Sequence, residues 1–332
     1  MSFNVKACLF YHLWSNLQAK IILLYVCVYV HIYIYVCVCV CVCVCVCVCV
    51  CVYVCITYLF TKNFVHINEM SFLLCNLVCQ EAFPNLEKLR LTLKATMEIW
   101  RGEFSRVSFS KLRVLKIIEC HGILTMISSK MVQILHNLER LEVKMCDSVN
   151  EVIQVERLSS EEFHVETLPR LTEICLEDLP MLMHLSRSGP YFQSLQTLEI
   201  VSCGSLINLV TPLMAKRLVQ LKKLIIRECH MIKEIVENDG HELIDNEIEF
   251  TRLKSLILYH LPNLKSFCSS ARYIFKFPSL ETMVVGECCG MEFFCKGVLD
   301  TPRLKSVYNK SLEECWQDDL NTTIRKKFMK QV

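Results

Sequence analysis

Glycine, proline and net charge are scarce in this chain of 332 residues. It contains 8 Gly and 8 Pro, which excludes a collagen-like chain and a Gly/Pro-rich linker architecture. The formal net charge is +2, so the chain lacks the basic excess of proteins that bind nucleic-acid backbones. Because hydrophobic residues make up 53% of the chain, the composition also excludes overall disorder.

The 23 cysteines are distributed very unevenly. Thirteen of them lie in residues 1–80, where Cys alternates with Val from Cys37 to Cys51, and the other ten are spread over residues 81–332. No C-x-x-C spacing occurs, so neither a zinc site nor another metal site is indicated. The chain therefore reads as two unlike pieces that divide after residue 80.

The first piece, residues 1–80, is a hydrophobic low-complexity segment. Residues 21–61 contain no formally charged side chain, and this stretch exceeds the ~20 residues that span a bilayer as a helix. However, alternating β-branched Val favours an extended chain, which alone cannot satisfy its backbone hydrogen bonds in lipid. Val-Cys is also what the codons GTG-TGT encode. We interpret residues 1–80 as a translated microsatellite or intron and not a domain, with a membrane anchor through residues 21–61 as the alternative.

The second piece repeats the pattern Leu-x-x-Leu-x-Leu. Successive copies begin 24 to 33 residues apart, which is the leucine-rich-repeat period with two insertions. We predict an α/β solenoid, a leucine-rich-repeat horseshoe with a parallel concave sheet and about nine irregular repeats, over residues 81–312. A polar C-terminal cap is predicted at 313–332, whereas no cap is apparent before the first repeat. The copies begin at Leu86, Leu112, Leu138, Leu171, Leu195, Leu221, Leu253, Leu280 and Leu304.

The ninth position of the repeat is Cys in five copies and Leu in most others. A thiol that recurs at the same turn in five repeats is expected to be a small buried hydrophobe. Two of these cysteines precede a histidine, at Cys120-His121 and Cys229-His230, but adjacent side chains point in different directions and suit neither a metal pair nor a nucleophile–base pair.

A longer period of 83 residues joins groups of three repeats. Leu112 and Leu195 are separated by 83 residues, as are Leu138 and Leu221. Acidic insertions follow at the same phase, at residues 150–166 and 234–249. The array is therefore interpreted as the product of a three-repeat duplication.

Candidate contact residues follow from the alternation of side chains along each strand. The third, fifth and seventh positions of the repeat face away from the core on the concave side. They give a basic end, an acidic middle and a mixed third region, which suits a protein partner of complementary charge. The alternative is that these side chains are simply solvated. The candidates are Lys88, Arg90, Lys116, Arg140, Glu142, Lys144, Glu173, Glu177, Asp178, Glu199, Lys223, Arg227, Tyr259 and His260.

Several phrases resemble the C-terminal repeats of plant coiled-coil NBS-LRR disease resistance proteins. They are Phe83-Pro84-Asn85-Leu86-Glu87-Lys88-Leu89, Cys229-His230-Met231-Ile232-Lys233-Glu234-Ile235 and Leu261-Pro262-Asn263-Leu264-Lys265-Ser266-Phe267, with the tail Trp316-Gln317-Asp318-Asp319-Leu320. The resemblance implies the cytoplasmic sensor region of an immune receptor. Such a region recognises a pathogen effector or a guarded host protein and restrains a nucleotide-binding NB-ARC module, in cis or in trans.

The departures from the family pattern concern the nucleotide switch. The phosphate-binding string G-x-x-x-x-G-K-[ST] does not occur in this sequence. We therefore expect a sensing arm that lacks the switch, with no cofactor, no nucleic-acid partner, and a membrane partner only if residues 21–61 are a real anchor.

Other classes of function remain as alternatives. No nucleophile motif such as G-x-S-x-G is present, so no catalytic residues are assigned and an enzyme is not expected. A receptor ectodomain would carry several N-x-[ST] sites, but only Asn309 and Asn321 begin one. A ligase substrate receptor, a membrane-tethered leucine-rich-repeat protein and a non-functional truncated product are the remaining readings.

Overall fold

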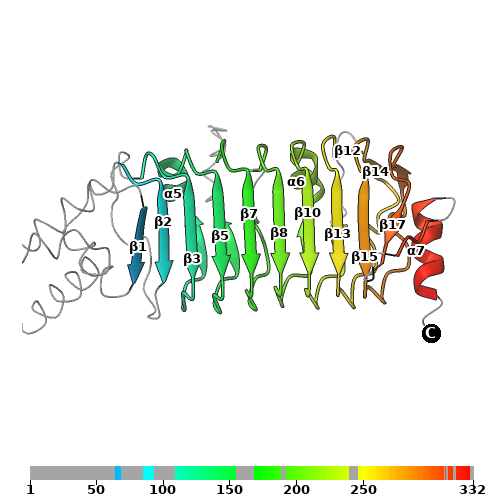
Figure 1. Ribbon diagram of the computed structural model, residues 1–332, viewed down its shortest axis with the longest axis horizontal. Coiled ribbons are helices and arrows are strands. Elements are labelled where there is room, and N and C mark those ends of the chain that lie inside the picture. The colour runs from blue at the N-terminus through cyan, green and yellow to red at the C-terminus, as the bar shows by residue number, and fades with distance from the viewer. Residues whose placement is uncertain are drawn as a thin grey trace, which may run out of the picture.

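The chain winds into a solenoid with a parallel sheet along one side (Figure 1). The sheet has ten strands in the order β1-β2-β3-β5-β7-β8-β10-β13-β15-β17, so each strand lies beside the strand of the next repeat. This computed structural model describes residues 64–68, 85–92, 109–154, 168–187, 192–238, 246–309, 311, 313–316 and 319–329.

Nine strands of this sheet coincide with the nine predicted repeats, which confirms the predicted solenoid. One more strand, β1 (Phe64–Asn68), precedes them and lies within the segment that was interpreted as low complexity; the division after residue 80 stays a prediction. In β1, Val65 and Ile67 are in register with Leu89 and Leu91 of the neighbouring strand. The others are β2 (Lys88–Thr92), β3 (Val114–Ile118), β5 (Arg140–Lys144), β7 (Glu173–Glu177), β8 (Thr197–Val201), β10 (Lys223–Arg227), β13 (Ser255–Tyr259), β15 (Thr282–Gly286) and β17 (Val307–Tyr308).

Short strands and two single-turn helices form the other sides of the solenoid. The 83-residue period is visible here, because helix α5 (Ser129–Ile134) begins 83 residues before helix α6 (Pro212–Arg217). Strands β4 and β9 also begin 83 residues apart, as do β6 and β11. The bounds are β4 (Thr125–Ser128), β6 (Glu151–Gln154), β9 (Asn208–Val210), β11 (Glu234–Val236), β12 (Glu247–Glu249), β14 (Ile274–Lys276) and β16 (Val298–Asp300).

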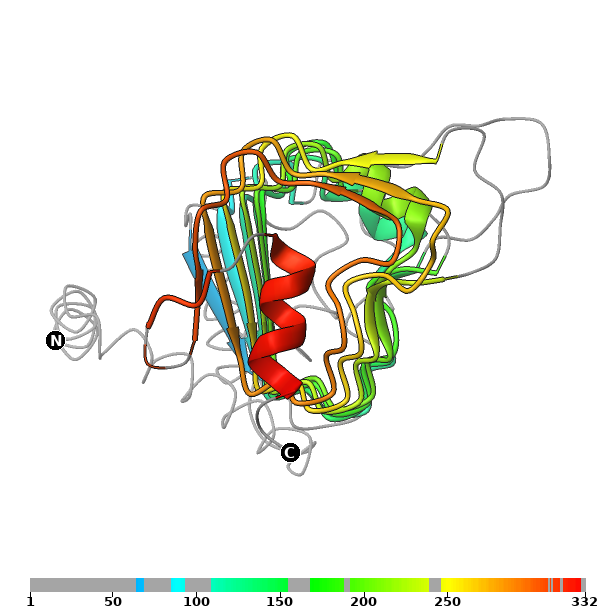
Figure 2. The ribbon, with the colours of Figure 1, turned by 90° about the vertical axis from the view of Figure 1, so that its right-hand side faces the viewer.

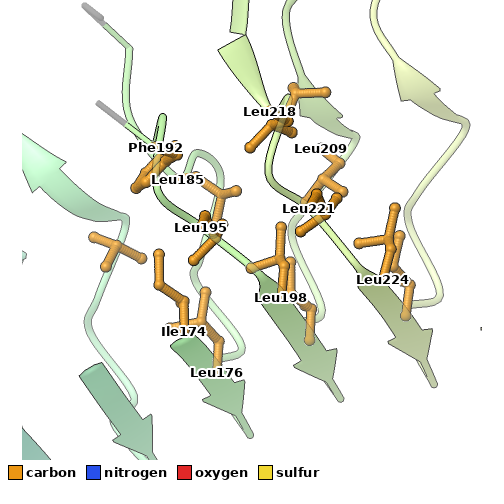
Figure 3. Close-up of a cluster of buried hydrophobic side chains, with 14 of the residues drawn as sticks. Ile174, Leu176, Leu185, Phe192, Leu195, Leu198, Leu209, Leu218, Leu221 and Leu224 are labelled. Carbon is orange, nitrogen blue, oxygen red and sulfur yellow. The ribbon is translucent and has the colours of Figure 1, made fainter. Parts of the chain in front are cut away.

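The core is a stack of leucine layers, one from each repeat (Figure 3). In β8, for example, Leu198 and Ile200 point inward and are fully buried, and Leu195 lies just before them. A buried Leu or Ile contributes about 1.5–3 kcal/mol relative to an exposed one. Because each layer is covered only by the layers on either side, the repeats gain this stability together and not singly.

Seven strands of the sheet, from β3 to β15, are followed directly by a residue with left-handed backbone geometry. At the eighth position of the repeat, seven residues that are not glycine have φ between 52° and 56°. Their backbone N–H groups continue the ladder, as where Met145 N donates to the Glu177 carbonyl at 2.9 Å. This geometry turns the chain out of the sheet at the same point in these seven repeats. The seven are Glu119, Met145, Asp178, Ser202, Glu228, His260 and Glu287.

The cysteine that follows this turn is buried in all five copies, as the sequence predicts. Its thiol donates to the backbone carbonyl two residues earlier, at 3.2 Å from Cys146 to Lys144 and at 3.2 Å from Cys229 to Arg227. The neighbouring Cys120 thiol and burial together raise the pKa of Cys146. The Cys146 thiol therefore stays protonated at neutral pH and acts as a donor, not as a nucleophile.

Helix α7 (Leu320–Met329) lies across the C-terminal end of the solenoid (Figure 2). It lies in the segment 313–332, for which the sequence predicts a polar cap. Leu320 and Ile324 are buried against the core, and Asn321 completes the backbone hydrogen bonds of the last turn. Its Oδ1 accepts from the N–H of Phe294 at 2.8 Å and of Cys295 at 3.1 Å, and its Nδ2 donates to the Cys295 carbonyl at 3.0 Å.

The left-handed turn predicts opposite effects for two substitutions of the exposed Met145. A β-branched side chain is strongly disfavoured at positive φ, so Met145→Val should lower the free energy of unfolding by about 1–2 kcal/mol. Asn tolerates this geometry, so Met145→Asn should leave stability within about 0.5 kcal/mol. Urea unfolding followed by circular dichroism measures both, and equal losses in the two variants would contradict the turn geometry.

The contacts of Asn321 predict a local effect at the last turn of the solenoid. Asn321→Leu leaves three backbone groups without their partner, which should lower the free energy of unfolding by about 1–3 kcal/mol. Hydrogen exchange should accelerate at the Phe294 and Cys295 amides while β7 and β8 keep their protection. The exposed Arg325 on the same helix provides the control, since Arg325→Leu should change neither amide. Unchanged protection in the Asn321→Leu variant would show that these bonds do not hold the end.

Candidate functional site: the outer face of the sheet

The outer face of the sheet, opposite the core, carries the candidate contact residues. It is formed by the third, fifth and seventh positions of each repeat, and most of these side chains are exposed or half-buried. Two of the candidates, Asp178 and His260, do not lie on this face. They occupy the left-handed eighth position of the repeat, just after the strand ends. The face therefore divides into the strands themselves and the edge where the strands stop.

A network of six charges covers β3, β5 and β7. Glu142 lies at its centre, with Lys116 Nζ at 2.7 Å from Oε2 and Lys144 Nζ at 3.2 Å from Oε1. Lys144 also pairs with Glu177 at 2.8 Å. Arg140 pairs with Glu173 at 2.8 Å and lies 3.7 Å from Glu142. These distances come from parallel strands in register, which place the fifth position of one strand beside that of the next.

Glu142 differs from its sequence expectation, because it is buried and does not face solvent. The long side chains of Lys116 and Lys144 reach it from both sides. Burial acts to raise the pKa of the Glu142 carboxyl, but hydrogen bonds and charge attraction from the two lysines outweigh it and lower this pKa. In turn, the hydrogen bond to Glu177 raises the pKa of Lys144.

Residues of the predicted basic end and of the predicted acidic middle therefore pair with one another in a single neutral network. Three cations, Lys116, Arg140 and Lys144, meet three carboxylates, those of Glu142, Glu173 and Glu177. Lys88 and Arg90 of β2 remain outside this network. A partner that contacts β3 to β7 meets charges already neutralised by each other, which weakens long-range attraction there.

The face changes character over β10, β13 and β15. Its fifth positions are Ile225, which is 3% exposed, and the half-buried Ile257 and Val284. The sequence-based candidates did not include these three residues. Their outward position is nevertheless indicated by the strings Leu224-Ile225-Ile226, Leu256-Ile257-Leu258 and Met283-Val284-Val285. In each string the middle residue lies between two inward-facing residues and must therefore face away from the core. They form an apolar strip on the outside of the sheet.

Two cations border this strip. Lys223 is exposed and Arg227 is half-buried. They occupy the third and seventh positions of the repeat, at the two ends of β10, on either side of Ile225. Within the described residues neither makes an ion pair. Glu199, on the neighbouring β8, also has no ion pair there. The combination of an apolar centre with cations at its rim is typical of protein interfaces.

A cluster of polar rings lies at the strand ends next to the strip. His260 Nδ1 is 2.8 Å from Glu287 Oε2, and the His260 ring meets His230 edge-on with centroids 5.1 Å apart. Tyr259 lies beside His260, with centroids 6.4 Å apart. Among the described residues no group of three or more His, Cys, Asp or Glu side chains is arranged to hold a metal ion.

No helix within the described part of the chain is long and apolar enough to cross a membrane. Residues 21–61, on which the alternative of a membrane anchor rests, lie outside the described residues. Residues 155–166 and 239–245 of the two acidic insertions also lie outside the described residues.

The charge network predicts a pH-dependent contribution to stability. Glu142→Gln should lower the free energy of unfolding by about 1–3 kcal/mol at pH 7, because the buried amide cannot pair with two lysines. The native carboxyl has a pKa below its ordinary value of 4.5, so its contribution is present above that pH. It is lost as pH falls through the lowered native value.

Urea unfolding of both proteins between pH 3 and pH 7 tests this, and the difference between them should shrink toward acid. Glu199→Gln serves as control, since Glu199 has no ion pair among the described residues. A difference that stays constant with pH would contradict a paired carboxylate at position 142.

Comparison with known proteins places the repeats in a family. The family described as plant disease resistance protein RPS2-like, leucine-rich repeats, matches residues 85–230 and 190–294, together 210 of 332 residues. The chain is 31% identical over 133 residues to the probable disease resistance protein At4g27220 of Arabidopsis thaliana, covering 39% of this chain and 14% of that protein. It is 28% identical over 129 residues to the disease resistance protein At4g27190 of the same plant, covering 38% and 12%.

A third relative, the Arabidopsis thaliana disease resistance protein UNI, is 35% identical over 99 residues, which cover 30% of this chain and 10% of that protein. The matched part therefore spans about one seventh or less of the length of these curated relatives. The family match itself covers more than half of this chain. By its fold and by this match, the chain belongs to the leucine-rich-repeat family of plant disease resistance proteins.

Proposed function

We propose that this chain is the recognition arm of a plant immune receptor in the cytoplasm, where it binds a pathogen effector or a guarded host protein. The observation that carries the proposal is the apolar strip of Ile225, Ile257 and Val284 with the cations Lys223 and Arg227 at its rim. A solenoid offers such a face as an extended binding surface. The names of the relatives, which describe disease resistance proteins, support the setting of defence.

The contact chemistry follows from the strip. An apolar or aromatic side chain of the partner would cover Ile257 and Val284, and carboxylates around it would meet Lys223 and Arg227. The neutral charge network over β3 to β7 then contributes shape complementarity to the interface but little electrostatic attraction. In this proposal the chain acts by binding and not by catalysis.

A nucleotide-binding NB-ARC module, in cis or in trans, is the second partner in the proposal. The relatives are about seven to ten times longer than the segments that match, so the chain corresponds to one region of such a protein. Binding of the effector or host protein to the sheet would be transmitted to that module.

The proposal is tested by a yeast two-hybrid screen of the full chain against secreted pathogen proteins and leaf proteins. A partner found in this way should lose affinity about tenfold or more with Lys223→Glu combined with Arg227→Glu, because like charges then meet at the rim. Titration calorimetry with purified proteins measures the change.

Lys296→Glu provides the matched control, because Lys296 is exposed and lies outside the sheet. It should leave the affinity unchanged. A partner that binds all three proteins equally well would show that recognition uses another surface, and replacement of a partner carboxylate by lysine should restore binding to the doubly reversed chain.

A further inference from the structure

A row of side chains lies on the edge of the solenoid where the strands end (Figure 1). Its residues occupy the thirteenth position of successive repeats, in the turns that follow the strands. We call this row the turn ridge. In the seven repeats that begin at Leu112 through Leu280, it consists of Leu124, Asn150, Met183, Ile207, Lys233, Lys265 and Glu292.

Backbone hydrogen bonds hold the ridge in line. Asn150 N donates to the Leu124 carbonyl at 3.0 Å, and Met183 N donates to the Asn150 carbonyl at 3.0 Å. Lys233 N donates to the Ile207 carbonyl at 2.8 Å. Between the turns that carry Met183 and Ile207, the Ser205 hydroxyl donates to the Pro180 carbonyl at 2.7 Å. The ridge is therefore as regular as the sheet beside it.

One part of the ridge is apolar and unusually exposed. Leu124 is 61% exposed, Ile207 46% and Met183 39%. Two further exposed methionines, Met181 and Met231, flank them two positions earlier in their repeats. Contiguous apolar side chains on a surface mark interaction sites, and methionine adapts its shape to a partner.

The other part of the ridge is cationic. Lys233 and Lys265 follow Ile207 in the next two repeats, and both are exposed. Neither makes an ion pair within the described residues. The ridge thus presents apolar side chains in three of its first four repeats and then two positive charges, in that fixed order. Glu292, whose N–H donates to the Lys265 carbonyl at 2.9 Å, follows in the last repeat of the row.

The spacing of the ridge suits an α-helix that lies along it. Neighbouring parallel strands are about 4.8 Å apart, and one helical turn rises about 5.4 Å, so one turn matches one repeat. An extended peptide brings a side chain to the same face only every ~6.7 Å and falls out of step sooner.

From this spacing and charge order we propose that the turn ridge docks an amphipathic helix of another protein. That helix carries apolar side chains along one face for about four turns and carboxylates on the same face for the next two. The surface is separate from the sheet that the proposed function uses, and the two can fail independently.

The order of the ridge argues against a second copy of this chain as the occupant. In a two-fold dimer with fully overlapping antiparallel ridges, Leu124 and Met183 of one copy would lie against Glu292 and Lys233 of the other. A shifted pairing of Lys265 with Glu292 would leave the apolar part uncovered. With parallel ridges the lysines would oppose one another. Only a partner with carboxylates at one end satisfies both parts.

The test uses the full chain and two synthetic helical peptides of about 22 residues, the length of six turns. The first carries Leu along one face for four turns and then Glu for two. The second has the same composition, but Leu and Glu alternate along that face. Fluorescence anisotropy should show the first peptide binding about tenfold more tightly, since only it matches the order of the ridge.

Variants locate the binding site. Ile207→Ser and Met183→Ser should each weaken binding about fivefold, because each removes apolar contact area. Lys233→Glu with Lys265→Glu should abolish binding of the first peptide and allow binding of a version with Lys in place of Glu. The control is Val298→Ser, which removes a 62% exposed apolar side chain elsewhere and should change nothing.

Four outcomes would overturn the proposal. The first two are equal affinity for the two peptides and a loss of peptide affinity in the Val298→Ser variant equal to that of the ridge variants. The third is dimerisation of the chain, measured by sedimentation, that Ile207→Ser abolishes. The fourth is binding to phosphatidylserine vesicles that the two lysine reversals abolish. The last two would assign the ridge to a second copy or to a membrane surface.

Discussion

The structure depends on one constraint: no repeat can bury its own apolar side chains. Leu198 and Ile200 are fully buried only because the layers of β7 and β10 lie on either side. The same stacking places equivalent positions of every repeat in straight rows. Surface properties consequently come in rows as well, so a single substitution in one repeat changes one point of a linear array. Both candidate interaction surfaces are such arrays, one on the sheet and one on the turns.

The predictable part of the fold follows from spacing. Nine sheet strands lie where the leucine pattern puts them, because inward leucines at the fourth and sixth positions define strand, face and register together. Strand β1 was missed, since Val65 and Ile67 carry the alternation without leucine and stand beside a tract that dominates the composition. The left-handed turns were also not predicted, because residues such as Glu, Met, Ser and His occupy positions at which a glycine would have indicated positive φ.

The candidate site was predictable in outline and not in electrostatics. Alternation identifies which side chains leave the core, so Lys116, Glu142 and Lys144 were assigned to the correct face. That Glu142 would be buried depends on the register between three strands far apart in the chain, and sequence position alone does not supply it. Conversely, Ile225 was not named as a candidate, because the candidates were chosen among polar and aromatic side chains, although alternation places it on the same outward face as Glu142.

The two proposed surfaces favour different kinds of partner, and this difference has a structural origin. On the sheet, side chains are held on both sides by neighbouring strands, so charges such as Lys144 and Glu177 find each other and the surface becomes rigid. On the turns, Met183 and Ile207 are exposed apolar side chains that no ion pair holds, and methionine is unbranched and flexible. A rigid face favours a preformed complementary surface, whereas a ridge of adaptable side chains tolerates variation in a helix that packs on it. A single solenoid can therefore combine selective recognition on its sheet with a more permissive contact along its edge.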